Sequence, residues 1–240
     1  MPFQLRREEV LDGEQLRAML TENPARAAQA ILIAAKQGIV DGQALLGQIL
    51  LDGQGIERDA VLAKRWFQIA ANGGHLMARN MLGRCWELGW GGPVDWALAS
   101  LEYRQAAEAG LDWAMYNYAN LLATGRGVIE NQPAALALYR QAAERGHAKS
   151  MNLVGRYLEG GQFCAQDLDA ARHWYKCSAQ GGDFRGQFSH ASVLAEAGQI
   201  DEALVWFERA LAGGNSKFLA AAHQTLASAP DPRIRALAQP

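Results

Sequence analysis

Small and apolar residues recur along this chain in a fixed order and at a fixed spacing. In each copy an alanine is followed four residues later by a large apolar residue, three residues after that by a pair of small residues, and then by a glycine. The pairs begin at intervals of 36 residues, except for a last interval of 32: Ala34, Ala70, Ala106, Ala142, Ser178 and Ala210. Six occurrences in one frame establish an internal repeat.

Each copy of the repeat predicts two helices. The alanine, the large apolar residue and the small pair are spaced to lie on one helical face, and the glycine that follows is typical of a helix end. This predicts a second helix over about 59–72 in the first full copy. A first helix precedes it and carries a recurrent small residue, which indicates a close approach of two helices: Leu46-Gly47, Leu82-Gly83, Tyr118-Ala119, Val154-Gly155 and His190-Ala191.

The two helices of a copy are separated by a glycine turn and a capping residue. Gly-x-Gly occurs at 53–55, 89–91 and 125–127, and good N-cap residues follow at Asp59, Asp95, Asn131 and Asp167. Such hairpins cannot bury their apolar faces alone, so they stack. The sequence predicts an all-α fold, an α/α superhelical solenoid of about five helix-turn-helix repeats.

We expect a single domain over 1–240, with an N-terminal cap in 1–23, repeats in 24–215 and a C-terminal cap in 216–240. That second cap should hold a helix over 216–229 and a short turn that begins at Asp231-Pro232.

This order of residues resembles a known family. The pattern Ala-x₃-Leu-Gly, Gly-x-Gly, Asp and Ala-x₃-Tyr-x₂-Ala-Ala-x₂-Gly, nearly complete over 78–110, is similar to the Sel-one-like repeat, a relative of the tetratricopeptide repeat. The resemblance implies an adaptor or scaffold for other proteins. Some secreted relatives carry a cysteine pair in each repeat and have been associated with β-lactam binding. Here Cys85, Cys164 and Cys177 occupy three different repeat positions, so that feature is missing.

Composition and charge narrow the class of protein. Half of the chain is apolar, and 23 basic residues against 25 acidic ones give a net charge of −2. This balance excludes intrinsic disorder and argues against nucleic-acid binding through bulk positive charge. No apolar run reaches the roughly 20 residues that a membrane span requires, and the charged N-terminus lacks a signal-peptide core. We therefore expect a soluble cytoplasmic protein with no membrane or nucleic-acid partner.

Candidate catalytic chemistry is sparse. The spacing of the cysteines and histidines indicates no metal site, cofactor site or catalytic triad. His75 and His147 share one repeat position and are expected in loops. His190 occupies the position of Leu46 and Leu82, so we expect it to be partly buried with a hydrogen-bond partner. It is the one candidate base for the alternative function, a small-molecule hydrolase. The favoured interpretation is that the protein is not an enzyme.

The first helices carry the more informative pattern. At the positions that face the groove of a tetratricopeptide-like hairpin, three successive helices hold polar or aromatic residues four apart. Amide and guanidinium groups side by side suit a carboxylate or an extended peptide backbone, and aromatic residues would anchor it. The predicted partner-binding residues are Asn80, Arg84, Trp113, Tyr116, Asn120, Lys149, Asn152 and Arg156.

Other interpretations of these residues remain open. Arg84 with Glu87, and Arg156 with Glu159, could form ordinary ion pairs within one helix. The C-terminal segment 230–240 could fill the groove. Trp90 and Trp96 could form a patch for self-association, whereas the tryptophans of the second helices are expected in the core: Trp66, Trp174 and Trp206. The favoured function is an adaptor, a monomer or weak dimer, that binds an unidentified protein or an acidic, extended peptide in its concave groove.

Overall fold

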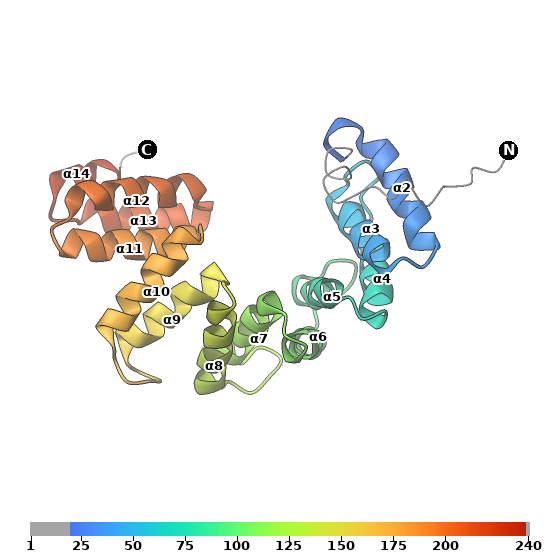
Figure 1. Ribbon diagram of the computed structural model, residues 1–240, viewed down its shortest axis with the longest axis horizontal. Coiled ribbons are helices and arrows are strands. Elements are labelled where there is room, and N and C mark those ends of the chain that lie inside the picture. The colour runs from blue at the N-terminus through green and yellow to red at the C-terminus, as the bar shows by residue number, and fades with distance from the viewer. Residues whose placement is uncertain (1–19, 239–240) are drawn as a thin grey trace. The chain divides into compact units, whose positions relative to one another are not determined.

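The computed structural model describes residues 20–238, and within that range its regular elements are all helices. Figure 1 shows them following one another as short antiparallel pairs. This confirms the predicted all-α fold. Most of the predicted N-terminal cap, residues 1–19, lies outside the described residues.

The described helices form five hairpins, with one helix before them and two after. The hairpins are α3 (Val40–Asp52) with α4 (Ala60–Asn72), α5 (Leu76–Leu88) with α6 (Trp96–Glu108), α7 (Asp112–Thr124) with α8 (Gln132–Glu144), α9 (Ala148–Gly160) with α10 (Leu168–Gln180), and α11 (Phe184–Glu196) with α12 (Ile200–Gly213). Helix α2 (Pro24–Lys36) precedes them, and α13 (Ser216–Ala227) and α14 (Pro232–Ala236) follow. The predicted C-terminal helix and final turn are thus both present.

The N-caps explain where the helices begin. Asp59 accepts a hydrogen bond from the backbone N–H of Leu62 at 2.9 Å, and Asp95, Asn131 and Asp167 do the same in later copies. Two of the first helices, α5 and α9, also begin at a capping histidine, which sequence reasoning missed. His75 and His147, expected in loops, are the N-caps of α5 and α9. Their side chains accept the hydrogen bonds that fix the first turns of these helices.

The small residue of each first helix allows the closest helix contact in the hairpin. A Cβ added at Gly83 would lie 2.6 Å from the Tyr103 ring, and one at Gly155 would lie 2.6 Å from the Tyr175 ring. No side chain fits at these distances, so the glycines let an aromatic ring of the second helix lie directly on the backbone of the first. The close approach expected from the sequence is confirmed.

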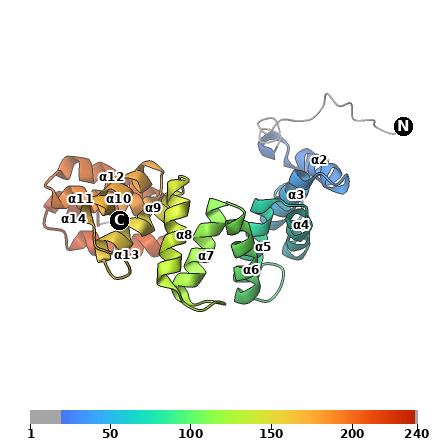
Figure 2. The ribbon, with the colours of Figure 1, turned by 60° about the horizontal axis from the view of Figure 1, so that its bottom comes forward.

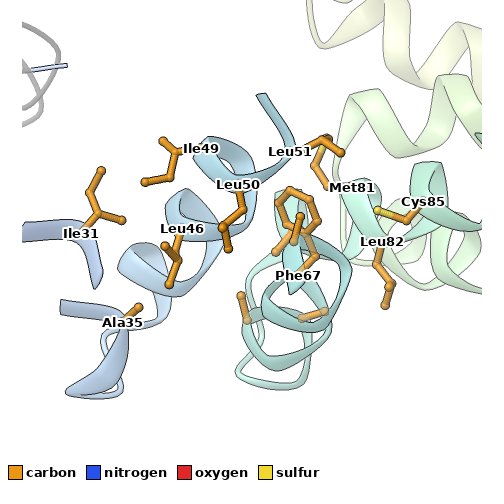
Figure 3. Packing of buried hydrophobic residues seen from close by; sticks show 14 of the residues in the cluster. Ile31, Ala35, Leu46, Ile49, Leu50, Leu51, Phe67, Met81, Leu82 and Cys85 are labelled. Carbon is orange, nitrogen blue, oxygen red and sulfur yellow. The ribbon is translucent and has the colours of Figure 1, made fainter. Parts of the chain in front are cut away.

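The chain divides into two compact units between Ala109 and Gly110. In the first unit Phe67 of α4 lies between Leu50 of α3 and Met81 of α5, at the centre of a cluster of buried residues (Figure 3). Trp66 of α4 and Trp90, in the turn after α5, are half-buried against this cluster. The expectation of one domain over 1–240 remains a prediction.

The second unit holds two further clusters. One surrounds Tyr139 and Tyr175 on α7 to α10, and the other surrounds Phe207 and Leu226 on α11 to α14. Figure 2 shows α7 and α8 side by side. Trp174 and Trp206 are half-buried at the edges of these clusters, as Trp66 is in the first unit; none of the three is a fully buried core residue. In the part of the chain that the structure covers, no helix has the length and apolar character needed to span a bilayer.

Candidate functional site

The eight predicted partner-binding residues lie on three first helices and in both compact units. Asn80 and Arg84 belong to α5 in the first unit. The others belong to α7 and α9 in the second unit: Trp113, Tyr116, Asn120, Lys149, Asn152 and Arg156.

In the first unit Arg84 is the more accessible of the two predicted residues. Its guanidinium carbon lies 4.8 Å from the centre of the Trp90 ring, so the planar group is held against the indole. Asn80 is only 2% exposed, and its amide nitrogen lies 3.9 Å from the sulfur of Met77. Trp90 is therefore partly covered by Arg84, which reduces the exposed aromatic patch that the sequence suggested.

In the second unit the two predicted amides are engaged in scaffold contacts. Asn120 Oδ1 accepts a hydrogen bond from the Tyr139 hydroxyl at 2.7 Å, which joins α7 to α8. Asn152 is 3% exposed, and its Oδ1 accepts from the Ser189 hydroxyl of α11 at 3.0 Å. These oxygens hold the helices together, a role that the sequence pattern did not indicate.

Among the predicted residues of this unit, Trp113 is an exposed aromatic residue. Its side chain is 41% exposed, and its ring meets the imidazole of His147 edge-on at 4.7 Å between centroids. Tyr116 contacts the same imidazole at 4.9 Å. The ammonium group of Lys149 lies 5.1 Å from the centre of the Trp113 ring. A cation, an exposed indole and a phenol are thus held together around one buried histidine.

His147 organises this group of rings. It is 5% exposed, and its Nδ1 accepts a hydrogen bond from the backbone N–H of Ser150 at 3.3 Å and lies 2.9 Å from the Ser150 hydroxyl. Its Nε2 is buried and makes no hydrogen bond to any residue that the structure describes. Burial lowers the pKa of His147, so the imidazole is neutral at physiological pH. The three-residue spacing from His147 to Ser150 at the start of a helix was the available sequence signal.

The rings continue from His147 toward a cavity. Tyr116 lies 6.2 Å from Tyr139, Tyr139 lies 6.1 Å from Tyr157, and Tyr157 lies 6.0 Å from Phe163. The cavity at the end of this row has a volume of about 470 Å³. Its lining comes from α7, α8, α9 and the turn after α9: Ala123, Gln132, Tyr139, Leu153, Arg156, Tyr157, Glu159, Gly160, Gln162 and Phe163.

The acidic neighbours of the two arginines do not form the ion pairs considered above. Glu87 accepts a hydrogen bond from the Tyr103 hydroxyl at 2.5 Å, and Glu159 accepts one from the Tyr175 hydroxyl at 2.7 Å. Among the described residues neither glutamate lies in an ion pair with Arg84 or Arg156. Arg156 is exposed and lines the cavity, and among residues 20–238 its guanidinium makes no hydrogen bond or ion pair.

His190 differs from the expectation in one respect. It is buried, as predicted, and contacts Trp206 at 5.5 Å between ring centroids. The predicted hydrogen-bond partner is not found among residues 20–238, where its buried Nδ1 makes no hydrogen bond. Burial also lowers its pKa. Over residues 20–238 no group of three His, Cys, Asp or Glu side chains is placed to hold a metal ion.

Comparison with known proteins identifies the repeat. The family model of the Sel1 repeat matches residues 40–75, 114–147, 148–183 and 197–215, more than half of the chain. A crystal structure of a Sel1 repeat protein from Oxalobacter formigenes is similar at 27% identity and a TM-score of 0.72, over 93% of both chains. No curated protein matches.

Two further solved structures are similar. One is c5321, described as a protective antigen present in uropathogenic Escherichia coli strains and displaying an SLR fold. It matches at 25% identity and a TM-score of 0.68, over 88% of this chain and 48% of that one. The immunity protein Pa5087 from Pseudomonas aeruginosa shares the fold at 15% identity and a TM-score of 0.56, over 82% of this chain and 74% of that one.

Proposed function

Because the chain belongs to the Sel1 repeat family, whose members generally mediate protein–protein interaction, we propose that it is a protein-binding adaptor that captures an extended, acidic segment of its partner. The proposed surface in the second unit, called here the α7–α9 face, consists of Trp113, Tyr116, Lys149 and Arg156. Asn120 and Asn152 support it from below. In the first unit Arg84, with Asn80 behind it, is proposed as a separate contact of the same chemistry.

The observation that carries this proposal is the exposed Trp113 beside Lys149. A large aromatic side chain that is 41% exposed, held in place by a buried histidine and flanked by a cation, is typical of a binding hot spot. Lys149 and Arg156 lie seven residues apart on α9, which places them on one helical face about 10 Å apart. Two cations at this distance would attract acidic side chains of one extended peptide.

We assign no catalytic role in this proposal. In the described part of the chain, the Nδ1 of His190, the one histidine that the sequence offers as a base, makes no hydrogen bond that would orient its ring. We also propose that the protein acts in the cytoplasm and is a monomer or weak dimer. Sedimentation of the purified chain would test the oligomeric state. The half-buried state of Trp90, against which Arg84 is held, argues against strong self-association through that patch.

Selection from a library of random peptides displayed on phage tests the adaptor function. The wild-type chain should enrich acidic peptides, and the double variant Lys149→Ala/Arg156→Ala should lose that enrichment. Arg140→Ala/Lys176→Ala removes the same charge from exposed positions on the second helices of the same unit and should select the same peptides as wild type. Both variants should melt close to the wild-type temperature, because surface substitutions of this kind change stability by about 0.5 kcal/mol or less. Enrichment that is equal in all three proteins would refute the α7–α9 face.

A further inference from the structure

The cavity beside Arg156 has a polar and an apolar side. Its volume of about 470 Å³ lies in the range of sites for small ligands and is too small for a helix or a folded domain. The apolar side is formed by Leu153, Tyr157 and Phe163. Phe163, in the turn after α9, is 45% exposed although it contacts the Tyr157 ring. An apolar group of a ligand would cover this exposed ring.

Most polar groups of the cavity already have partners. The Tyr157 hydroxyl donates to Gln132 Oε1, and Gln132 Nε2 donates to the carbonyl oxygen of Ala123 at 2.7 Å. The Tyr139 hydroxyl donates to Asn120. These bonds fix the walls of the cavity and occupy the hydroxyl and amide donors of Tyr157, Gln132 and Tyr139.

Two donors at the rim have no such partner. Among the described residues, the guanidinium of Arg156 and the amide of Gln162 make no hydrogen bond or ion pair, and both side chains are exposed. A guanidinium fork and an amide N–H in the lining of one cavity match the two oxygens of a carboxylate. Glu159, also in the lining, accepts from the Tyr175 hydroxyl through Oε2 and has further oxygen lone pairs for an N–H group of a ligand.

We propose that this cavity binds the C-terminal residue of a partner chain. The free α-carboxylate would bind Arg156 and Gln162, the backbone N–H would face Glu159, and an apolar or aromatic side chain would cover Phe163 and Tyr157. A C-terminal residue carries these three groups on one Cα, whereas an aspartate or glutamate within a chain lacks the apolar group. The inference rests on the proposed adaptor function for its source of ligand. It adds that the partner ends in an apolar residue and that this C-terminal residue is what the cavity recognises.

The test uses single-residue probes on the full chain. N-acetyl-phenylalanine is titrated against the protein, and the arginine Nε–Hε signals and phenylalanine ring signals are followed by NMR. We expect saturable shifts of the Arg156 and Phe163 signals. N-acetyl-phenylalanine amide, which lacks the carboxylate, should bind at least about tenfold more weakly, because the charge-assisted hydrogen bonds are lost. N-acetyl-aspartate amide, a carboxylate without the apolar group, should bind as weakly as the first amide.

Two variants separate this inference from the adaptor proposal. Arg156→Gln should weaken N-acetyl-phenylalanine by about tenfold or more. Lys149→Gln removes the same charge on the same helix outside the cavity lining, and it should leave the binding of this probe unchanged while it weakens acidic peptides. Binding of the probe without any enrichment of acidic peptides would leave the pocket standing and refute the adaptor proposal.

Three results would overturn the assignment to a C-terminal residue. The first is no shift of Arg156 or Phe163 with N-acetyl-phenylalanine, whatever the peptide selection gives. The second is equal binding of the acid and its amide. The third is binding of free phenylalanine tenfold tighter than its N-acetyl derivative, which would assign the cavity to a free amino acid instead.

Discussion

At the scale of single residues, the capping histidine His147 links the stability of α9 to pH. Its Nδ1 accepts from the backbone of Ser150, so the cap exists only while that nitrogen is unprotonated. Burial lowers the pKa of His147 most strongly; Asp112 opposes this by favouring the charged form, and Lys149 lowers the pKa further. A folded-state pKa below the unfolded value of about 6.5 means that stability is fully present above that pH. It is lost as the pH falls below about 6.5 toward the folded-state pKa.

The substitution His147→Asn should remove this pH dependence. Asparagine caps a helix at any pH, a contribution of about 1 kcal/mol, so the melting temperature of the variant should fall less than that of wild type between pH 7.5 and pH 5. The quantity to compare is the change in melting temperature between the two pH values. The smaller asparagine also leaves space between Trp113 and Tyr116, which affects stability at both pH values. His75→Asn replaces the same capping histidine of α5, where Nε2 lies 3.7 Å from Asp41, and controls for the exchange of a histidine cap for an asparagine cap. Parallel melting curves for wild type and His147→Asn would contradict the prediction.

Local signals were predictable at this scale and contacts between helices were not. Asp59 and Asp95 could be identified as N-caps because a cap and its target are three residues apart in sequence. The amides of Asn120 and Asn152 looked free for a ligand, since nothing in the sequence shows that the Tyr139 and Ser189 hydroxyls reach them. The unpaired Nδ1 of His190 was mispredicted for the same reason.

At the scale of the helices, the 36-residue period determines the hairpins well. The helix predicted over 59–72 is α4, Ala60–Asn72, and the one predicted over 216–229 is α13, Ser216–Ala227. Boundaries are predictable because periodicity, capping residues and glycines all lie within the element. The cavity at Arg156 was not predictable from the sequence, because α7, α8, α9 and the turn after α9 all contribute residues to its lining.

Substitution of a glycine at the closest helix contact tests the packing within a hairpin. Gly155→Ala would place its Cβ 2.6 Å from the Tyr175 ring, and a shift of that ring would disturb the hydrogen bond to Glu159. We expect a loss of about 1–3 kcal/mol from overpacking, larger than the gain of about 1 kcal/mol in helix propensity. Urea unfolding followed by circular dichroism measures the difference.

Gly160→Ala is the matched control for this substitution. It lies on the same helix, and nothing lies within 4 Å of a Cβ added there. It should leave the free energy of unfolding unchanged or slightly raised. The third hairpin shows the alternative arrangement, in which Ala119 replaces the glycine and the Tyr139 hydroxyl bonds Asn120 instead. Equal midpoints for the two variants would show that the ring can move at no cost.

At the scale of the whole molecule, the repeat predicts that stability is distributed by nearest neighbours. In a solenoid each repeat is stabilised mainly by the repeats beside it, so a core defect acts locally. Phe67 is almost fully buried and packs with Leu50 and Met81 in the first unit. Phe67→Ala should therefore cost about 3–5 kcal/mol there. Hydrogen exchange should show lost protection in α3, α4 and α5, with α9 to α12 protected as in wild type.

The reciprocal substitution makes this result decisive. Phe207 occupies the same repeat position in the second unit, packed in the cluster of α11 to α14, and Phe207→Ala should lower protection there and spare α3 and α4. Opposite patterns in the two variants would mean that the 36-residue copies contribute separately to stability, which lets single repeats change their exposed residues independently. A uniform loss of protection in both variants would mean instead that residues 20–238 unfold as one cooperative domain, because a defect in either core would then be felt by every helix.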